Sequence, residues 1–462
     1  MTESTTAKQE EDLVSTQQKN YFAIDALKAF AIALVVLDHS LTWELKHAIG
    51  GPFWERTAIP FFLIIMGFNL GLSFKRSGAK TLRELYSKVY FNKKLTRYVG
   101  PFLILYGASY LVGLYFNSLT WDAYSFLLFL PFSGPGNWFI PVLFTSVLVL
   151  PLVYWAYIRY PKLTVLLCFL SEILLGVFLF FNVPLGWNGT AFTYQSYEAA
   201  FITTVIRVTI PFYLPAVGLG LWFSDGWDIK SKHNRLMWIA FPLSVVYISA
   251  YHFLGFRVQI ESGEVINRLI WGDYTLLMYP YAAFFFLLAL MYLPSSPTNR
   301  LARFIARVGK ASYHIYLFQD FYFSFWYNLT DFGSTGLEYP ALHLPFYLLC
   351  IIICLVGGLG WYELEQRATT DGRSWWNHPW MVRTKYLAAA GLTLMMMTVA
   401  VELVLVVSGL IGYSDDVIPY WAFTSETAPV VLFTFVLILV FIGITIRFLW
   451  KAFESADMPI PD

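Results

Sequence analysis

The sequence predicts an all-α, polytopic membrane protein. Three observations support this prediction: the composition, the length of the apolar runs and the positions of the basic residues. Of the 462 residues, 58% are hydrophobic and only 13% are charged, and the mean hydropathy is +0.57. Soluble chains carry about 25% charged residues. The composition therefore excludes an ordinary soluble globule.

Apolar runs long enough to cross a bilayer recur along the whole chain. A hydrocarbon core of about 30 Å needs about twenty residues of α-helix. About twelve spans are expected, near residues 23–43, 57–75, 98–117, 137–158, 163–183, 204–224, 236–255, 275–294, 311–330, 343–363, 386–411 and 428–450.

The Lys and Arg residues fall mainly on one side of these spans. If the amino terminus is cytoplasmic, 26 of the 31 Lys and Arg residues lie in cytoplasmic segments. This asymmetry predicts a multi-pass protein of the cell membrane with both termini in the cytoplasm. Residues 1–20 are polar, contain no apolar signal-peptide core, and are expected to form a disordered cytoplasmic tail.

The first span, Ile24 to Trp43, carries Asp25, Lys28, Asp38 and His39. A charge inside a transmembrane helix costs roughly 2.5 to 3.5 kcal/mol, so such groups usually face a polar cavity or a partner. Helical geometry places Lys28 and His39 within about 20° of one face and about 16 Å apart along the axis. Asp25 lies one turn before Lys28 and can pair with it. This helix is predicted to line a site.

Other segments offer further candidates for binding. Residues 75–97 form the most basic segment. It is either a topological determinant against anionic lipid or a platform for a cytoplasmic polyanion, with Lys94 and Arg97 placed to hold phosphate. The outer segments 118–136 and 184–203 are polar and aromatic, which suits either sugar contact or a membrane interface.

Some polar and sulfur-containing side chains inside the spans have no assigned role. The polar residues are Glu172, Arg207, His252, His314, Asp320 and Glu402. For a lone histidine in a span, a packing role is favoured over catalysis. Asp320 could line the same cavity as His39, and Glu402 could pair within an accessory bundle. Three cysteines lie in apolar runs without zinc spacing, so neither a disulfide framework nor a metal site is expected: Cys168, Cys350 and Cys354.

A series of short motifs runs through the first ten spans. They are D-A-L-K-A-F-A-I-A-L-V-V-L-D-H in the first span, I-P-F-F-L-I-I-M-G-F in the second, K-K-L-T-R-Y-V-G-P before the third, G-N-W-F-I-P-V-L-F, A-S-Y-H-I-Y-L-F-Q and W-Y-E-L-E-Q-R. In this order they resemble acyltransferase family 3, polytopic membrane proteins that transfer acyl groups, commonly acetyl or succinyl, to cell-surface glycans. The departures are Met66 in place of a usual serine, and lysine at positions 28 and 94 where arginine is common.

The resemblance implies a ten-helix acyltransferase core over residues 21–370, followed by a C-terminal extension, residues 371–462, with two more transmembrane helices. In this resemblance, the family's motif positions correspond to Lys28, His39, Lys94, Arg97, Trp138, Ser312 and Tyr313 of this chain. It implies an O-acyltransferase that moves an acyl group, most commonly acetyl, from cytoplasmic acyl-CoA to a hydroxyl of a cell-surface or lipid-linked saccharide. Such a reaction modifies polysaccharide of the cell envelope.

Each candidate residue has an expected role in that reaction. His39 is the general base, because a hydroxyl is a poor nucleophile at neutral pH and imidazole titrates near pH 6.5. Lys28, Lys94 and Arg97 are expected to bind the donor, with Trp138, Ser312 and Tyr313 as further binding residues. Asp25 would orient Lys28. Asp38 either helps to set the imidazole or faces elsewhere.

The expected partners are the lipid bilayer, a saccharide acceptor and acyl-CoA, with acetyl-CoA the foremost donor. Neither a metal nor a nucleic acid is expected. A transporter or exporter of a glycan or anionic solute is the main alternative, since it too would carry buried charge and twelve spans. No inverted repeat is apparent, and transport gives no reason for the spacing of Lys28 and His39. A third possibility is an inactive relative that serves as a structural subunit.

Overall fold

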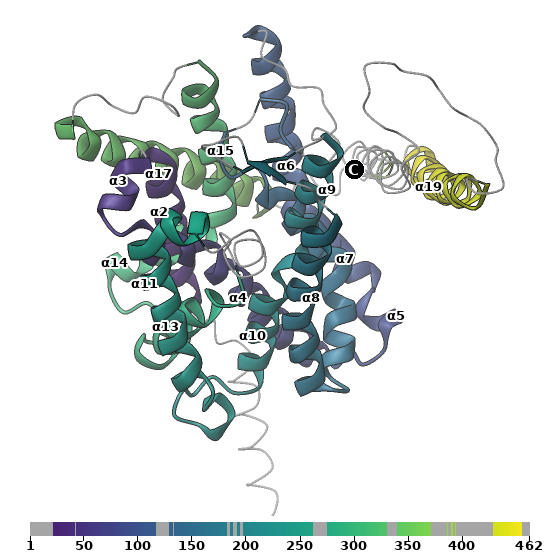
Figure 1. Ribbon diagram of the computed structural model, residues 1–462. Coiled ribbons are helices and arrows are strands. Elements are labelled where there is room, and N and C mark those ends of the chain that lie inside the picture. Colours follow the sequence, from purple (N-terminus) through teal and green to yellow (C-terminus); the bar gives the residue numbers. More distant parts are fainter. Residues whose placement is uncertain are drawn as a thin grey trace, which may run out of the picture.

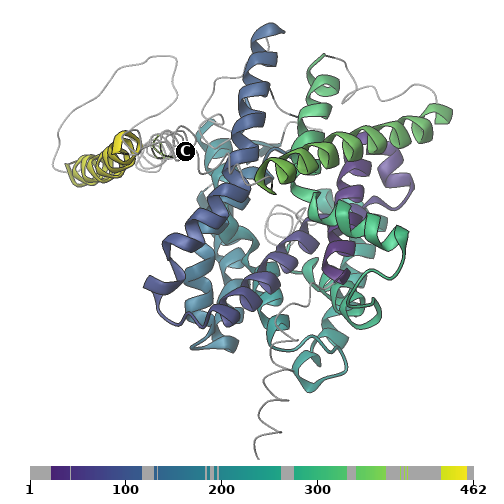
Figure 2. The ribbon, with the colours of Figure 1, turned by 180° about the vertical axis from the view of Figure 1, so that it is seen from behind.

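A computed structural model describes residues 22–41, 43–116, 129–132, 134–182, 185–187, 192–194, 197–261, 275–329, 340–370 and 428–454, with residues 386, 390 and 393 as isolated positions. Most of these residues are helical (Figures 1 and 2). The longer helices are α2 (Phe22–Ser40), α4 (Gly51–Ser77), α6 (Lys88–Tyr115), α7 (Phe139–Tyr157), α8 (Pro161–Asn182), α9 (Tyr197–Arg207), α10 (Leu214–Asp225), α11 (Met237–Glu261), α13 (Tyr279–Tyr292), α14 (Arg300–Lys310), α15 (Ser312–Leu329), α17 (Pro340–Thr370) and α19 (Ala428–Glu454).

Short elements join these helices. They are α3 (Trp43–Ala48), α5 (Leu82–Leu85), the 3₁₀ turns η2 (Ile210–Tyr213) and η3 (Lys232–Asn234), and the antiparallel pair β1 (Leu185–Trp187) and β2 (Phe192–Tyr194). The strand pair is the only sheet among the described residues, and Leu185 faces Tyr194 in its register. The prediction of an all-α polytopic fold is confirmed, with this small hairpin as an addition.

Seven helices in the described part of the chain are long and apolar enough to cross a membrane, or eight if a bent pair counts as one span. The bent pair consists of residues 201–207 and 210–225, which meet at 55°. Pro211 lies directly after its break and explains the bend, because proline cannot donate the hydrogen bond that would continue the helix from Arg207. Ten of the twelve predicted spans coincide with α2, α4, α6, α7, α8, this pair, α11, α13, α15 and α17, and the last coincides with α19. Most of the eleventh, 386–411, lies outside the described residues, so the number twelve stays a prediction.

Two helices begin earlier than the sequence predicted. α4 starts at Gly51 rather than near residue 57, after Gly50 in a left-handed conformation and with Pro52 in its first turn. α6 starts at Lys88 rather than near residue 98, because the side chain of Ser87 accepts a hydrogen bond from the Tyr90 amide and caps the helix. Lys94 and Arg97, which the sequence placed in a basic loop, are therefore held on a helix.

The core of the bundle is built around α2 and α4. α2 packs against α4, α14, α15 and α17, and α4 packs closely against α10 (Figure 1). A Cβ atom on Gly67 would overlap the Val217 carbonyl, and one on Gly220 would overlap the Ile64 carbonyl. The α4 and α10 backbones are therefore in direct contact, which the absence of a side chain at both glycines allows.

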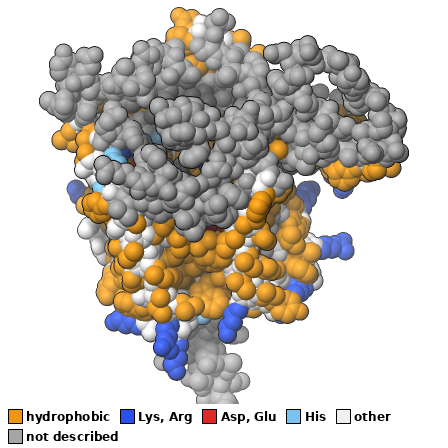
Figure 3. Space-filling model, viewed as in Figure 1, with side chains coloured by type: hydrophobic (Ala, Val, Ile, Leu, Met, Phe, Trp, Pro, Cys, Tyr) orange, Lys and Arg blue, Asp and Glu red, His pale blue; other side chains and the backbone are white. Residues whose placement is uncertain are grey.

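One end of the bundle carries Lys75 at the end of α4, Arg159 after α7 and Lys232 in η3, and we call it the basic face. Lys75 at the end of α4 pairs with Asp225 at the end of α10, and Tyr157 at the end of α7 donates to the same carboxylate. In the space-filling view, Lys and Arg side chains form a rim below a broad hydrophobic belt (Figure 3). A belt of this kind above a charged rim is the surface expected of a helix bundle within a bilayer.

Candidate functional site

His39 lies at the last turn of α2, at the end of the bundle opposite the basic face. Its Nδ1 atom is 2.7 Å from Oε1 of Gln319, a residue of α15 that lies 280 positions away in the chain. The ring of Phe323, one turn further along α15, meets the imidazole edge-on with centroids 5.9 Å apart. The imidazole is therefore largely buried and held from one side by α15.

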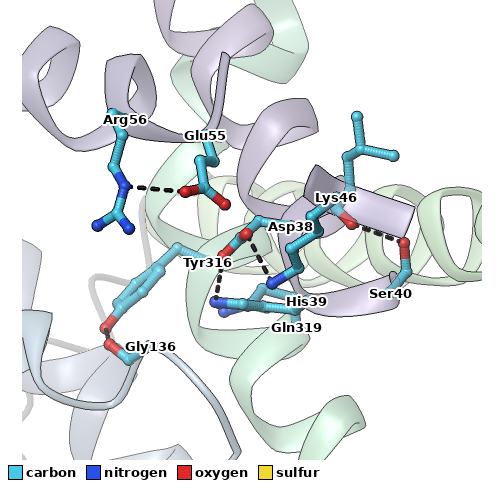
Figure 4. A network of polar contacts seen from close by, with 10 residues as sticks. Asp38, His39, Ser40, Lys46, Glu55, Arg56, Gly136, Tyr316 and Gln319 are labelled. Atoms are coloured by element: carbon cyan, nitrogen blue, oxygen red, sulfur yellow. Dashed lines mark hydrogen bonds and ion pairs between the residues drawn. The ribbon is translucent and has the colours of Figure 1, made fainter. Parts of the chain in front are cut away.

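Asp38 and Lys46 lie on the other side of the imidazole, and the Glu55–Arg56 pair lies beyond them (Figure 4). Asp38 Oδ2 is 3.6 Å from His39 Nε2, and Asp38 Oδ1 is 2.8 Å from Lys46 Nζ. Glu55 Oε1 is 2.8 Å from Arg56 Nε, and both of these side chains are more than nine-tenths buried. The sequence left two orientations open for Asp38. The structure turns its carboxylate towards both His39 and Lys46.

The turn before α7 closes over the imidazole. Gly136 has φ +99°, and a Cβ atom there would lie 2.9 Å from His39 Cε1, 3.5 Å from Gln319 Nε2 and 3.6 Å from His39 Nε2. Tyr316 Oη donates to the Gly136 carbonyl at 2.7 Å and fixes the turn to α15. Only glycine fits here, because any side chain would enter the space in front of the imidazole.

Lys28 lies at the other end of α2, on the side of the basic face. Asp25 Oδ1 is 3.5 Å from Lys28 Nζ, the contact expected from their spacing. Tyr98 of α6 lies among three cations: Lys94 Nζ and Arg97 Cζ are 5.6 Å and 5.9 Å from the centroid of its ring, and the Lys28 ammonium lies on the same side of the bundle. The structure therefore brings the predicted donor residues of α2 and α6 together.

Tyr313 of α15 belongs to the same cluster. Its Oη donates to the Tyr98 carbonyl at 2.9 Å, and the two rings meet edge-on. Ser312 is the first residue of α15 and is buried. Trp138 lies at the other end of the bundle, immediately before α7 and close to Gly136, where its ring stacks on Tyr213. Trp138 thus belongs with His39, whereas Ser312 and Tyr313 lie with Lys28.

The remaining polar side chains of the spans lie elsewhere. Glu172 Oε1 accepts from the Leu276 amide at 2.7 Å, His314 Nε2 is 2.8 Å from Glu365 Oε2, and His252 stacks on His47. Arg207 is exposed at the end of α9, and Glu402 is outside the described residues. Asp320 is fully buried, with its backbone against Gly134, while its neighbour Gln319 contacts His39.

Several residues of this site were missed by sequence reasoning. Lys46 and Arg56 are two of the five Lys and Arg residues outside the expected cytoplasmic segments, and Gln319 and Tyr316 lie in the A-S-Y-H-I-Y-L-F-Q motif without an assigned role. The one available signal was the spacing of Tyr313, Tyr316 and Gln319 at three-residue intervals, which puts them on neighbouring faces of one helix. In the described part of the chain, no group of three or more His, Cys, Asp or Glu residues could hold a metal ion.

The fold and the site together define a multi-pass membrane protein with a buried histidine at one end of a helix and a cluster of cations at the other. The family described as Acyltransferase domain matches residues 21–362, roughly three quarters of the chain. The chain belongs to acyltransferase family 3, as its motifs indicated, and is a membrane acyltransferase. No curated protein and no solved structure matches the chain.

Proposed function

We propose that this protein transfers an acyl group, in the first instance acetyl, from cytoplasmic acyl-CoA to a hydroxyl of a saccharide on or facing the cell surface. The observation that carries the proposal is the setting of His39. Its imidazole is fixed at Nδ1 by Gln319, faces the Asp38 carboxylate at Nε2, and lies on the same helix as Lys28 of the cation cluster.

His39 acts as the general base in this proposal. With Gln319 Oε1 accepting from Nδ1–H, the neutral ring offers the Nε2 lone pair to the acceptor hydroxyl. As the hydroxyl oxygen attacks the thioester carbon, its proton passes to Nε2. Asp38, 3.6 Å from Nε2, then stabilises the imidazolium, and Lys46 keeps the carboxylate in place. The imidazolium returns the proton to the departing CoA thiolate.

Lys28, Lys94 and Arg97 bind the phosphate groups of the donor. Phosphate is recognised by Arg through its planar fork and by Lys as a point charge. Tyr98 and Tyr313 support this cluster, and Asp25 orients Lys28. The basic face then lies in the cytoplasm with both termini, which agrees with the distribution of Lys and Arg.

α2 sets the distance between the donor-binding residue Lys28 and the proposed base His39. Because Phe22–Ser40 is a single continuous helix, Lys28 and His39 are separated by about 16 Å at 1.5 Å per residue. The donor phosphates stay at the basic face in this proposal, and the thioester at the end of the extended arm of CoA reaches His39. The acceptor hydroxyl arrives from the opposite end of the bundle.

The proposal is tested with purified protein in detergent and [1-¹⁴C]acetyl-CoA. A total glycan extract from the envelope of cells that produce the protein serves as acceptor. We expect label to move into the extract in an ester linkage that mild alkali releases. Heat-inactivated protein is the control. Intact donor and unlabelled extract after prolonged incubation would reject acyl transfer and leave transport or a structural role.

Removing both cations of α6 should weaken donor binding. Each charged hydrogen bond contributes about 1.5 to 3 kcal/mol, so Lys94→Ala/Arg97→Ala is expected to raise the Kd for acetyl-CoA by at least roughly tenfold. The loss should shrink in high salt, which screens exposed charges. Isothermal titration calorimetry measures both effects.

Lys80→Ala/Arg83→Ala is the matched control for this measurement. Both side chains are exposed, and the pair removes the same charge from the same basic segment before α6 begins. Equal loss of affinity in the two double variants would mean that only general charge matters. An unchanged Kd in Lys94→Ala/Arg97→Ala would leave these residues with a topological role.

A further inference from the structure

The carboxamide of Gln319 is fully buried, yet only half of it has a partner. Its Oε1 atom contacts His39 Nδ1 at 2.7 Å. Its Nε2 atom, which carries two N–H donors, makes no hydrogen bond to the described part of the protein. A buried donor without a partner costs about 1 to 3 kcal/mol. Such a group in a reaction site is a candidate to bind the ligand.

The unpartnered amide group and the proposed base face the same point beside Gly136. A Cβ atom on Gly136 would lie 3.5 Å from Gln319 Nε2, 3.6 Å from His39 Nε2 and 2.9 Å from His39 Cε1. The Gly136 backbone therefore packs directly against both groups, and Tyr316 holds it there through the glycine carbonyl. An N–H donor and a basic nitrogen this close to one another can act on the same acyl group, as acyl transfer requires.

We propose that Gln319 is a catalytic residue whose Nε2–H group stabilises the oxyanion formed on the acyl carbonyl oxygen, while its Oε1 holds the tautomer of His39. This inference rests on the proposed function. The sequence assigned no role to Gln319, and one carboxamide performs both tasks because its oxygen and nitrogen lie on opposite sides of the same planar group.

The proposed transfer conserves electrons and protons. The acceptor hydroxyl oxygen forms a bond to the thioester carbon, and its proton moves to His39 Nε2. The carbonyl π electrons move onto the carbonyl oxygen, which accepts a hydrogen bond from Gln319 Nε2. When the carbonyl re-forms, the C–S bond breaks and the CoA thiolate leaves with the proton from His39. The products are the ester and free CoA.

Gln319→Glu separates the two tasks of the carboxamide. Glutamate keeps the shape and an oxygen for His39 Nδ1–H but replaces the NH₂ donor by a second oxygen. Loss of an oxyanion donor lowers kcat by about 10²- to 10³-fold, and we expect this loss with an unchanged Kd for acetyl-CoA. Gln319→Leu removes both groups and should lose at least as much. If Gln319 only oriented the ring, the Glu variant would keep its kcat and the Leu variant would lose it.

Asn234→Asp is the matched control, because it makes the same amide-to-carboxylate change at a buried side chain away from His39. Asn234 of η3 donates from Nδ2 to the Gly226 and Asp228 carbonyls near the basic face. We expect kcat of the folded variant to stay near wild type. Equal losses in Asn234→Asp and Gln319→Glu would show that an added negative charge, rather than a lost donor, lowers the rate, and would overturn the inference.

A vibrational measurement detects the hydrogen bond itself. The probe is an acetyl-CoA analogue with CH₂ in place of the thioester sulfur and ¹³C at the ketone carbon, which cannot be transferred. Its C=O stretch should move to lower frequency on binding to the wild-type protein and should not move in Gln319→Glu. An identical shift in both proteins overturns this inference alone. Wild-type protein that neither binds nor turns over acetyl-CoA overturns the proposed function, and this inference with it.

Discussion

His39→Ala is expected to lower acyl transfer by about 10²- to 10⁴-fold, the range over which general bases contribute to catalysis. Donor affinity should not change, because the cation cluster at the Lys28 end of α2 remains. Expression and stability in detergent should stay near those of the wild type. Purified protein assayed with labelled acetyl-CoA, together with a direct binding measurement, reports both quantities.

His233→Ala is the matched control for this variant. His233 is a half-buried histidine of η3 that stacks on Trp222, away from α2 and near the basic face. Its removal tests the general cost of losing a packed imidazole. Substantial turnover by purified His39→Ala protein would remove His39 from the mechanism.

Gly136→Ala is expected to lower kcat by about 10²-fold, the effect of displacing catalytic groups by about 1 Å. Two causes combine at this position. A backbone with φ +99° is strained for any residue with a side chain, and the new methyl group would lie 2.9 Å from His39 Cε1. The imidazole must therefore turn away from the position that Gln319 and Asp38 give it. Steady-state kinetics measure the fall in kcat.

Gly78→Ala separates backbone strain from contact with the imidazole. Gly78 also has a positive φ, +66°, but a Cβ atom there would meet nothing within 4 Å. We expect this variant to lose some stability and to keep its kcat. If Gly136→Ala transferred acyl groups as fast as Gly78→Ala, the turn before α7 would not shape the site.

The sequence predicted the features that depend only on residues close together in the chain. The apolar run of α2, and the face shared by Lys28 and His39, follow from helical periodicity alone. The pairing of Asp25 with Lys28 needs only their three-residue spacing. The start of α4 was placed too late, because its second turn carries Glu55 and Arg56, two charges that make the segment look like a loop. Their mutual ion pair is what allows both to be buried.

The partners of His39 were beyond sequence reasoning, because they come from distant parts of the chain. Gln319 reaches the imidazole across 280 residues, and Gly136 approaches it from the turn before α7. Lys46 looked like a loop cation, because the sequence around it does not predict an ion pair with Asp38. Contacts of this kind depend on how α2, α7 and α15 pack, and a single sequence gives no measure of that packing.

The continuity of α2 also has a consequence for the electrical insulation of the membrane. Between Lys28 and His39, the same face of the helix carries only Ala31, Ile32 and Val35, all buried. That face of α2 offers an ion or a chain of water molecules no polar group to replace its hydration. In the proposed reaction only the uncharged arm of the donor enters this interval, and an uncharged arm costs less to bury than an ion. The proposed arrangement, with polar groups at the two ends of one helix, would let an acyl group pass while ions do not follow along this face.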